Sequence, residues 1–154
     1  AHAAYEQALK QAEAGTGDSA AAAFKGQEGT YATLAALRVA KAQVVAGKND
    51  EAIATLRAVK ADPALKAVVD QRLAQLLTST GKSDEALKLL EGATDSAAQE
   101  LRGDALVAAG KREEAKAEYG KALASLDIVA PARRRVELKL QDAGGQLPEP
   151  AESI

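Results

Sequence analysis

The sequence has no cysteine, no methionine and no tryptophan, and its single histidine is His2. Zinc sites and Cys–His or Ser–His nucleophilic pairs are therefore not expected, because cysteine and histidine would have to supply the metal ligands and the general base. We expect no catalytic residue, no metal site and no cofactor, with His2 an exposed residue of the first helical turn. The lack of cysteine fits an oxidising compartment without requiring one.

Aromatic residues are also scarce, at 3% of the chain, although 47% of its 154 residues are apolar. That apolar content is sufficient for one domain with a continuous core. The core is then built from Ala, Leu and Val, which favours closely packed helices over sheets, where aromatic and β-branched side chains are enriched. No alternating apolar and polar run is long enough to predict a strand, so we predict an all-α fold.

Neither sign of charge dominates, because 20 basic side chains are set against 22 acidic ones, for a net charge of −2. Nothing in this balance attracts nucleic acid, and we expect no nucleic-acid partner. The one basic cluster, Arg133 to Arg135, is either a solvated helix face or a docking site for an acidic partner. No apolar run approaches the roughly 20 residues that span a bilayer, so we expect no membrane-spanning helix and no signal peptide within these residues.

What the sequence does contain is a repeat. The motif Gly-Lys-x-x-Glu-Ala begins at Gly47, Gly81 and Gly110. The first two copies lie 34 residues apart, the period of the tetratricopeptide (TPR) helix-turn-helix, and the third follows after 29. Such repeats stack helix pairs into an array whose surface binds other polypeptides. The repeat therefore predicts a TPR-like right-handed helical solenoid of about nine helices.

Each copy of the motif has the chemistry of a tight turn between two helices. Glycine tolerates the positive φ that ends the first helix, and the lysine that follows is favoured at a helix C-terminus. Acidic residues then open the second helix, where unpaired backbone N–H groups favour negative charge. Such acidic pairs could act as acid–base catalysts, but they recur at every turn and an active site is usually made once. We therefore expect no enzymatic activity.

The motif also sets a small-then-large pattern along one face of each helix pair. The small residues let the helices approach closely, and the large ones fill the gap toward the neighbouring repeat. The small positions of the second helices are Ala52, Ala86 and Ala115, their large positions are Leu56, Leu90 and Tyr119, and the small positions of the first helices are Ala40, Ala74 and Gly103.

The periodicity predicts helices near 1–14, 18–27, 30–46, 49–60, 63–80, 83–91, 95–109, 112–126 and 131–142. The TPR-like domain then covers 1–143, with a degenerate N-terminal pair at 1–29, repeats at about 30–62, 63–94 and 95–128, and a capping helix at 131–142. Pro63 and Pro131 would begin helices, since proline has no N–H to leave unpaired in a first turn. Residues 144–154 would form a flexible tail.

Two glycine-containing segments resemble nucleotide-binding motifs but fail their spacing. Gly81-Lys82-Ser83 ends like a phosphate-binding loop, which needs glycine at position 76, where this chain has Leu76. Gly15-Thr16-Gly17 begins like a dinucleotide fingerprint, which needs glycine at position 20, where this chain has Ala20. We interpret the first segment as a repeat turn and the second as a helix-breaking linker.

The concave face of a TPR array is lined by the first helix of each pair. We predict that this face binds a protein partner weakly, through apolar contacts with little salt dependence, because its charges are mixed. The predicted protein-binding residues are Lys41, Val44, Val45, Gln71, Gln75, Thr78, Glu100, Asp104 and Val107.

The segment from Leu101 to Leu123, LRGDALVAAGKREEAKAEYGKAL, resembles the last repeat of the YfgM family, the TPR-type ancillary subunits of the SecYEG translocon in Gram-negative bacteria. Order and spacing extend the resemblance over residues 1 to about 142. The further matching segments are Ala4-Tyr5, Thr30-Tyr31-Ala32, Leu65 to Val69, Arg72-Leu73-Ala74, and Pro131 before the closing helix. This order is more specific than the Gly-Lys-x-x-Glu-Ala turns, which many TPR proteins share.

The resemblance implies a non-catalytic interaction module on the periplasmic face of the inner membrane, tethered by one N-terminal helix. A chain that begins at Ala1 and has no methionine is expected of a fragment without that anchor. The implied partners are the SecYEG translocon, a PpiD-like periplasmic chaperone or emerging proteins. The alternative is a generic soluble TPR adaptor that binds a peptide tail of a cytoplasmic partner. A membrane-spanning segment in the full-length protein would decide between them.

Overall fold

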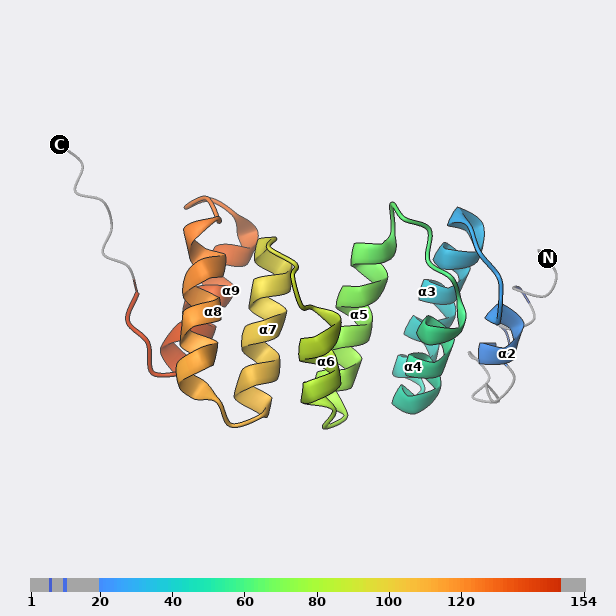
Figure 1. Cartoon of the computed structure of the whole chain (residues 1–154), viewed down its shortest axis with the longest axis horizontal. Helices are drawn as coiled ribbons and strands as arrows, with labels where there is room; N and C mark the ends of the chain where they lie inside the picture. The colour runs from blue at the N-terminus through green and yellow to red at the C-terminus, as the bar shows by residue number, and fades with distance from the viewer. Residues whose placement is uncertain (1–5, 7–9, 11–19, 148–154) are drawn as a thin grey trace. The chain divides into compact units, whose positions relative to one another are not determined.

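The computed structural model describes residues 6, 10 and 20–147, and this part of the chain contains helices but no strand (Figure 1). The predicted all-α class is confirmed. The helices are α2 (Ala20–Phe24), α3 (Thr30–Val45), α4 (Asn49–Ala58), α5 (Lys66–Ser79), α6 (Ser83–Leu89), α7 (Ser96–Ala108), α8 (Arg112–Ala124) and α9 (Pro131–Asp142). Glu6 and Lys10 are helical. The rest of the predicted first helix, including His2, and the last residues of the predicted tail lie outside the described residues.

The chain divides into two compact units, Ala1–Thr80 and Gly81–Ile154. We call them the N-terminal unit and the C-terminal unit. Helices α2 to α5 belong to the first, and α6 to α9 to the second. The predicted middle repeat therefore contributes one helix to each unit.

In the N-terminal unit, α2, α3 and α4 pack around Phe24, the only phenylalanine of the chain. The buried cluster consists of Phe24, Ala32, Ala36, Val39 and Val59. Helix α4 ends at Ala58, earlier than predicted, because Lys60 N donates a hydrogen bond to Gln27 O at 2.9 Å. Pairing with the segment after α2 holds the backbone extended there, so tertiary contact ends the helix.

Helix α5 begins at Lys66, so the prediction that Pro63 begins this helix is wrong. Asp62 explains the difference. Its backbone N–H donates to Thr33 Oγ1 at 3.0 Å, and its carboxylate accepts from Thr30 Oγ1 at 3.1 Å and from Ala64 N at 2.9 Å. These bonds tie the chain to the start of α3, and a turn from Asp62 to Leu65 separates the proline from the helix.

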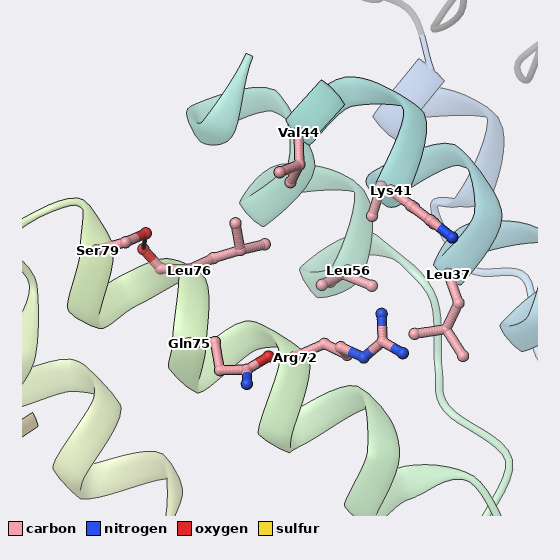
Figure 2. A pocket seen from close by; sticks show the side chains of 9 residues that line it. Leu37, Lys41, Val44, Leu56, Arg72, Gln75, Leu76 and Ser79 are labelled. Atoms are coloured by element: carbon pink, nitrogen blue, oxygen red, sulfur yellow. Dashed lines mark hydrogen bonds between the residues drawn. The ribbon is translucent and has the colours of Figure 1, made fainter. Parts of the chain in front are cut away.

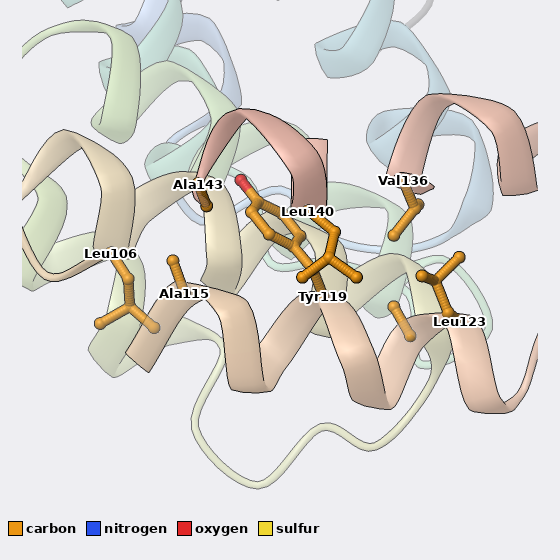
Figure 3. Close-up of a cluster of buried hydrophobic side chains, with 8 residues drawn as sticks. Leu106, Ala115, Tyr119, Leu123, Val136, Leu140 and Ala143 are labelled. Carbon is orange, nitrogen blue, oxygen red and sulfur yellow. The ribbon is translucent and has the colours of Figure 1, made fainter. Parts of the chain in front are cut away.

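In the C-terminal unit, α7 and α8 lie side by side and α9 packs against α8 (Figure 1). Their core contains Tyr119 surrounded by small and aliphatic side chains (Figure 3). Pro131 occupies the first turn of α9, as predicted. The buried residues of this core are Leu106, Ala115, Tyr119, Ala122, Leu123, Val136, Leu140 and Ala143.

The predicted turn chemistry is present at each motif. Gly47, Gly81 and Gly110 have φ of 78°, 81° and 78°, in the left-handed region that glycine tolerates. At Gly110 the turn is a Schellman motif, with Lys111 N donating to Leu106 O at 2.8 Å and Gly110 N to Val107 O at 3.0 Å. Acidic residues occupy the first turns of α4, α6 and α8, as predicted.

The small-then-large positions are all buried, as the repeat register predicts. At one of these positions, Gly103 on α7, the small residue lies directly against the ring of Tyr119 on α8. A Cβ atom at Gly103 would lie 2.4 Å from Tyr119 Cε1, which is far inside van der Waals contact. The buried positions include Ala40, Ala52, Leu56, Ala74, Ala86, Leu90, Ala115 and Tyr119.

Candidate protein-binding surface

An open, mainly apolar pocket of about 310 Å³ lies between α3, α4 and α5 of the N-terminal unit (Figure 2). Leu56 of α4 forms its floor and is only 3% exposed. The two walls are helix faces, one on α3 and one on α5. The lining residues are Leu37, Ala40, Lys41, Val44, Leu56, Arg72, Gln75, Leu76 and Ser79.

Both walls follow the spacing i, i+3, i+4, i+7 of a single helix face. On α3 these positions run from Leu37 to Val44, and on α5 from Arg72 to Ser79. Of the predicted concave set, this pocket brings together Lys41, Val44 and Gln75. The sequence reasoning missed Arg72, although its helical spacing from Gln75 was the signal that could have found it.

The other predicted residues of the N-terminal unit lie outside the pocket lining. Val45 is 82% exposed near the end of α3. Gln71 and Thr78 of α5 are half-buried. Of the predicted α5 residues, only Gln75 lines the pocket. The lining residues Arg72 and Ser79 each follow a predicted residue by one position.

The two charged residues of the pocket are both basic. Figure 2 shows the Arg72 side chain extending from α5 toward α3, into the space next to Leu37 and Lys41. Both Lys41 and Arg72 are exposed, and neither forms an ion pair or a hydrogen bond with the residues that the structure describes. The mixed charge is predicted for the whole concave face, and this pocket contains only Lys41, Val44 and Gln75 of that set.

In the C-terminal unit, Glu100 is held by α9. Arg135 donates two hydrogen bonds to the Glu100 carboxylate, from Nε at 2.7 Å and from Nη2 at 2.6 Å. Lys139 Nζ donates a third to the same carboxylate at 2.5 Å. Glu100 is only 6% exposed. This predicted surface residue is instead a buried anchor for the last helix.

Asp104 belongs to the same network. Its carboxylate accepts from Lys139 Nζ at 2.9 Å and from Tyr119 Oη at 2.7 Å. Val107, one turn further along α7, is 41% exposed. Of the three predicted residues on α7, Val107 alone has a side chain without an ionic role in this network.

The pKa shifts in this network favour the charged forms of Glu100 and Lys139 and the neutral form of Tyr119. Burial raises the pKa of Glu100, but hydrogen bonds from Arg135 and Lys139 and the positive charges of both lower it overall. Burial lowers the pKa of Lys139, but its bonds to Glu100 and Asp104 raise it overall. Burial, and then the hydrogen bond and charge of Asp104, raise the pKa of Tyr119. The three groups therefore remain carboxylate, ammonium and neutral phenol near neutral pH.

The basic cluster on α9 is in part the solvated face considered from the sequence, because Arg134 and Arg135 are exposed while Arg133 is half-buried. Arg133 donates to Leu123 O at 3.3 Å in the last turn of α8 and to Leu126 O at 2.7 Å just beyond it, so it caps the C-terminus of α8, and it also donates to Glu137 Oε1 at 3.1 Å. Arg135 is the bidentate partner of Glu100. The side chain of Arg134 is 68% exposed and lies within 3.4 Å of Glu137. Tertiary contact with α7 and α8 therefore uses most of this cluster internally.

A similar arginine holds α6. Arg102 on α7 donates to Leu90 O at 2.8 Å and to Ala93 O at 2.6 Å, at the C-terminus of α6, and its Nε donates to Glu118 of α8 at 3.2 Å.

In the part of the chain that the structure describes, no group of three His, Cys, Asp or Glu side chains is placed to hold a metal ion. No helix described is long and apolar enough to cross a membrane.

Comparison with known proteins agrees with this architecture. Residues 1–145 match the family of tetratricopeptide repeat-like domains. The chain is 29% identical over 149 residues to the ancillary SecYEG translocon subunit of Escherichia coli (strain K12), which covers 90% of this chain and 72% of that protein. No solved structure matches the chain. The helix pairs, their glycine turns and the match over residues 1–145 confirm the TPR-like fold, and the chain belongs to the tetratricopeptide repeat-like domain family.

Proposed function

We propose that this chain is the periplasmic interaction domain of an ancillary translocon subunit, which binds the SecYEG translocon, a periplasmic chaperone or emerging proteins. The TPR-like fold and a relative described as an ancillary SecYEG translocon subunit indicate a non-catalytic protein-interaction module. The location and the named partners are the parts of the proposal that go beyond the module itself.

The pocket between α3, α4 and α5 is the observation that carries the interaction role. It is open, it has an apolar floor at Leu56, and its rim carries polar groups that can orient a partner. A concave, mainly apolar site with a few polar groups is the usual form of a recognition site. We therefore assign the partner contact to Lys41, Val44 and Gln75 of the predicted set, and not to Glu100.

Tethering to the membrane explains how a shallow site suffices. A free domain meets a membrane partner by diffusion, whereas a domain held beside it by a short linker experiences an effective concentration of roughly millimolar. A site with a millimolar to micromolar dissociation constant is then substantially occupied. Weak contact in one pocket is consistent with an ancillary role.

The test is site-specific photo-crosslinking in the full-length protein in its own bacterium. A crosslinking amino acid at Val44 or at Gln75 should give adducts with a translocon component or a periplasmic chaperone. Ala54, exposed on α4 and outside the pocket lining, is the matched control and should give no such adduct. The absence of adducts at all positions, with the domain protected from protease added to the periplasm, would refute both the location and the role.

The second candidate is a soluble TPR adaptor that binds a peptide tail of a cytoplasmic partner. The two unpaired cations at the pocket rim are the observation that favours it, because they can attract an acidic tail. The protease-accessibility arm of the same experiment separates the two candidates, since only the cytoplasmic adaptor is protected.

A further inference from the structure

We propose that the pocket between α3, α4 and α5 recognises an extended segment of a partner protein that carries an aliphatic side chain flanked by aspartate or glutamate. The inference rests on the proposed interaction role and specifies which chemistry the pocket selects. The aliphatic side chain fills the apolar floor, and the flanking carboxylates lie against Lys41 and Arg72.

The size and lining of the pocket specify the aliphatic part. A volume of about 310 Å³ lies at the lower end of the range of about 300–1,000 Å³ for small-ligand sites. It therefore holds one or two side chains rather than the whole apolar face of a helix. Leu37, Leu56 and Leu76 supply branched aliphatic surface, and no aromatic residue lines the pocket, so leucine, isoleucine or valine is the matching shape.

The charges specify the flanking residues. Lys41 and Arg72 come from different helices and extend into the same space without an anion among the described residues (Figure 2). Two like charges directed at one space repel each other, and a carboxylate placed between them turns that repulsion into attraction. The same pair repels a segment flanked by lysine or arginine, so the rim selects against basic partners as well as for acidic ones.

Gln75 and Ser79 complete the rim on α5. Ser79 Oγ already donates to Leu76 O at 3.0 Å, so its hydroxyl hydrogen is committed to the helix. Gln75 is exposed, and its amide can both donate to and accept from the backbone of an extended segment. An extended backbone leaves its N–H and C=O groups free for such bonds, whereas a helix does not.

The first experiment measures the binding of four synthetic peptides to the purified full chain by fluorescence anisotropy. All are acetylated and amidated at their ends, so that no terminal charge contributes. Their sequences are Ser-Asp-Asp-Leu-Asp-Ser, the same peptide with Ala for Leu, and the two forms with Ser or Lys for every Asp. The leucine peptide with aspartate should bind most tightly, and the Leu→Ala, Ser and Lys forms should each bind about tenfold more weakly or worse.

The second experiment reverses the charges of the pocket. Lys41→Glu with Arg72→Glu should abolish binding of the aspartate peptide and create binding of the lysine peptide. Arg38→Glu is the matched control, because Arg38 is exposed on the same helix but does not line the pocket. This control should leave the preference for the aspartate peptide intact. All three positions are exposed, so circular dichroism should report the same helix content in each variant.

Several outcomes would overturn the proposal. Equal affinities for the aspartate, serine and lysine peptides would show that the rim does not select charge. An equal effect of Arg38→Glu would show attraction to the surface as a whole. Self-association that Ile128→Ser with Val129→Ser removes would assign the pocket to the Asp127-Ile128-Val129 loop of a second copy, since Ile128 and Val129 are 85% and 88% exposed. Crosslinks from Val44 without peptide selectivity would retain the interaction role and reject only this inference.

Discussion

Lys139 on α9 places its Nζ 2.5 Å from Glu100 Oε2 on α7, and the two residues are 39 positions apart in the sequence. The glutamate is buried, and a second cation, Arg135, grips its other oxygen at 2.6 Å. The last helix is therefore attached to the preceding repeat by charge as well as by the apolar contacts of Val136 and Leu140.

The stability of the C-terminal unit should depend on the ionisation of Glu100. Its folded pKa lies below the ordinary value of 4.5, so the unfolded chain binds the proton more readily. The contribution is fully present above pH 4.5 and is lost as the pH falls through the lower folded pKa. Urea unfolding at several pH values should show a steeper loss in wild type than in Glu100→Gln over this acidic range.

At neutral pH, Glu100→Gln should lower the free energy of unfolding by about 1–3 kcal/mol, because it weakens the three charge-assisted hydrogen bonds that Arg135 and Lys139 donate to this buried side chain. Glu113→Gln is the control, since the side chain of Glu113 is 86% exposed and makes only a surface pair with Lys116. Parallel acid profiles for wild type and Glu100→Gln would contradict the role assigned to this pair.

Gly103→Ala should destabilise the fold by about 1–3 kcal/mol through overpacking. The added Cβ would lie 2.4 Å from the Tyr119 ring, which is buried and tethered through its hydroxyl to Asp104, so the ring has little freedom to move. Tyr119→Leu should reduce the cost of Gly103→Ala in a double-mutant cycle measured by thermal unfolding. At the helical position Gly120 a new Cβ would meet no atom within 4 Å apart from its chain neighbours and the backbone of its own helix, so Gly120→Ala should instead stabilise the protein.

A buried polar pair joins α3 to α4. Thr55 Oγ1 donates to Gln43 Oε1 at 2.7 Å, both residues are 0% exposed, and Gln43 Nε2 has no hydrogen-bond partner in the described structure. Thr55→Val should cost about 1–3 kcal/mol, because it leaves the glutamine oxygen unpaired as well. Adding Gln43→Leu should recover most of that loss in chemical denaturation. A double variant less stable than Thr55→Val alone would show that Gln43 stabilises the unit even without Thr55, which contradicts this expectation.

Ala86 on α6 is fully buried at the small-residue position of its motif. Replacing it with leucine should cost about 1–3 kcal/mol, because three additional carbon atoms have no free space to occupy. Ala117→Leu, at an exposed position of α8, is the matched control and should change the thermal midpoint little. Equal midpoints for wild type and Ala86→Leu would contradict the repeat register.

Local chemistry makes the repeat architecture predictable from the amino-acid sequence. The turns at Gly47, Gly81 and Gly110, the acidic residues that follow them and the Pro131 start of α9 depend on backbone conformation and on unpaired groups within a few residues. For the same reason the helices predicted for α3, α4, α6, α7, α8 and α9 have ends within two residues of those observed. The buried small and large positions follow from helical spacing alone.

Tertiary packing decided the features that bear on function. The start of α5 depends on Thr33 and Asp62, which are 29 residues apart, and the pairing of Arg135 with Glu100 joins residues 35 apart. Sequence alone shows that these side chains can bond, but not which partner the packed helices bring within reach. The pocket is a further case, because Lys41 and Arg72 share it only through the packing of α3, α4 and α5. Periodicity therefore determined the helices and their turns. The packing of one helix on another determined which charged side chains form ion pairs within the fold and which, such as Lys41 and Arg72, stay unpaired at the surface of the described structure.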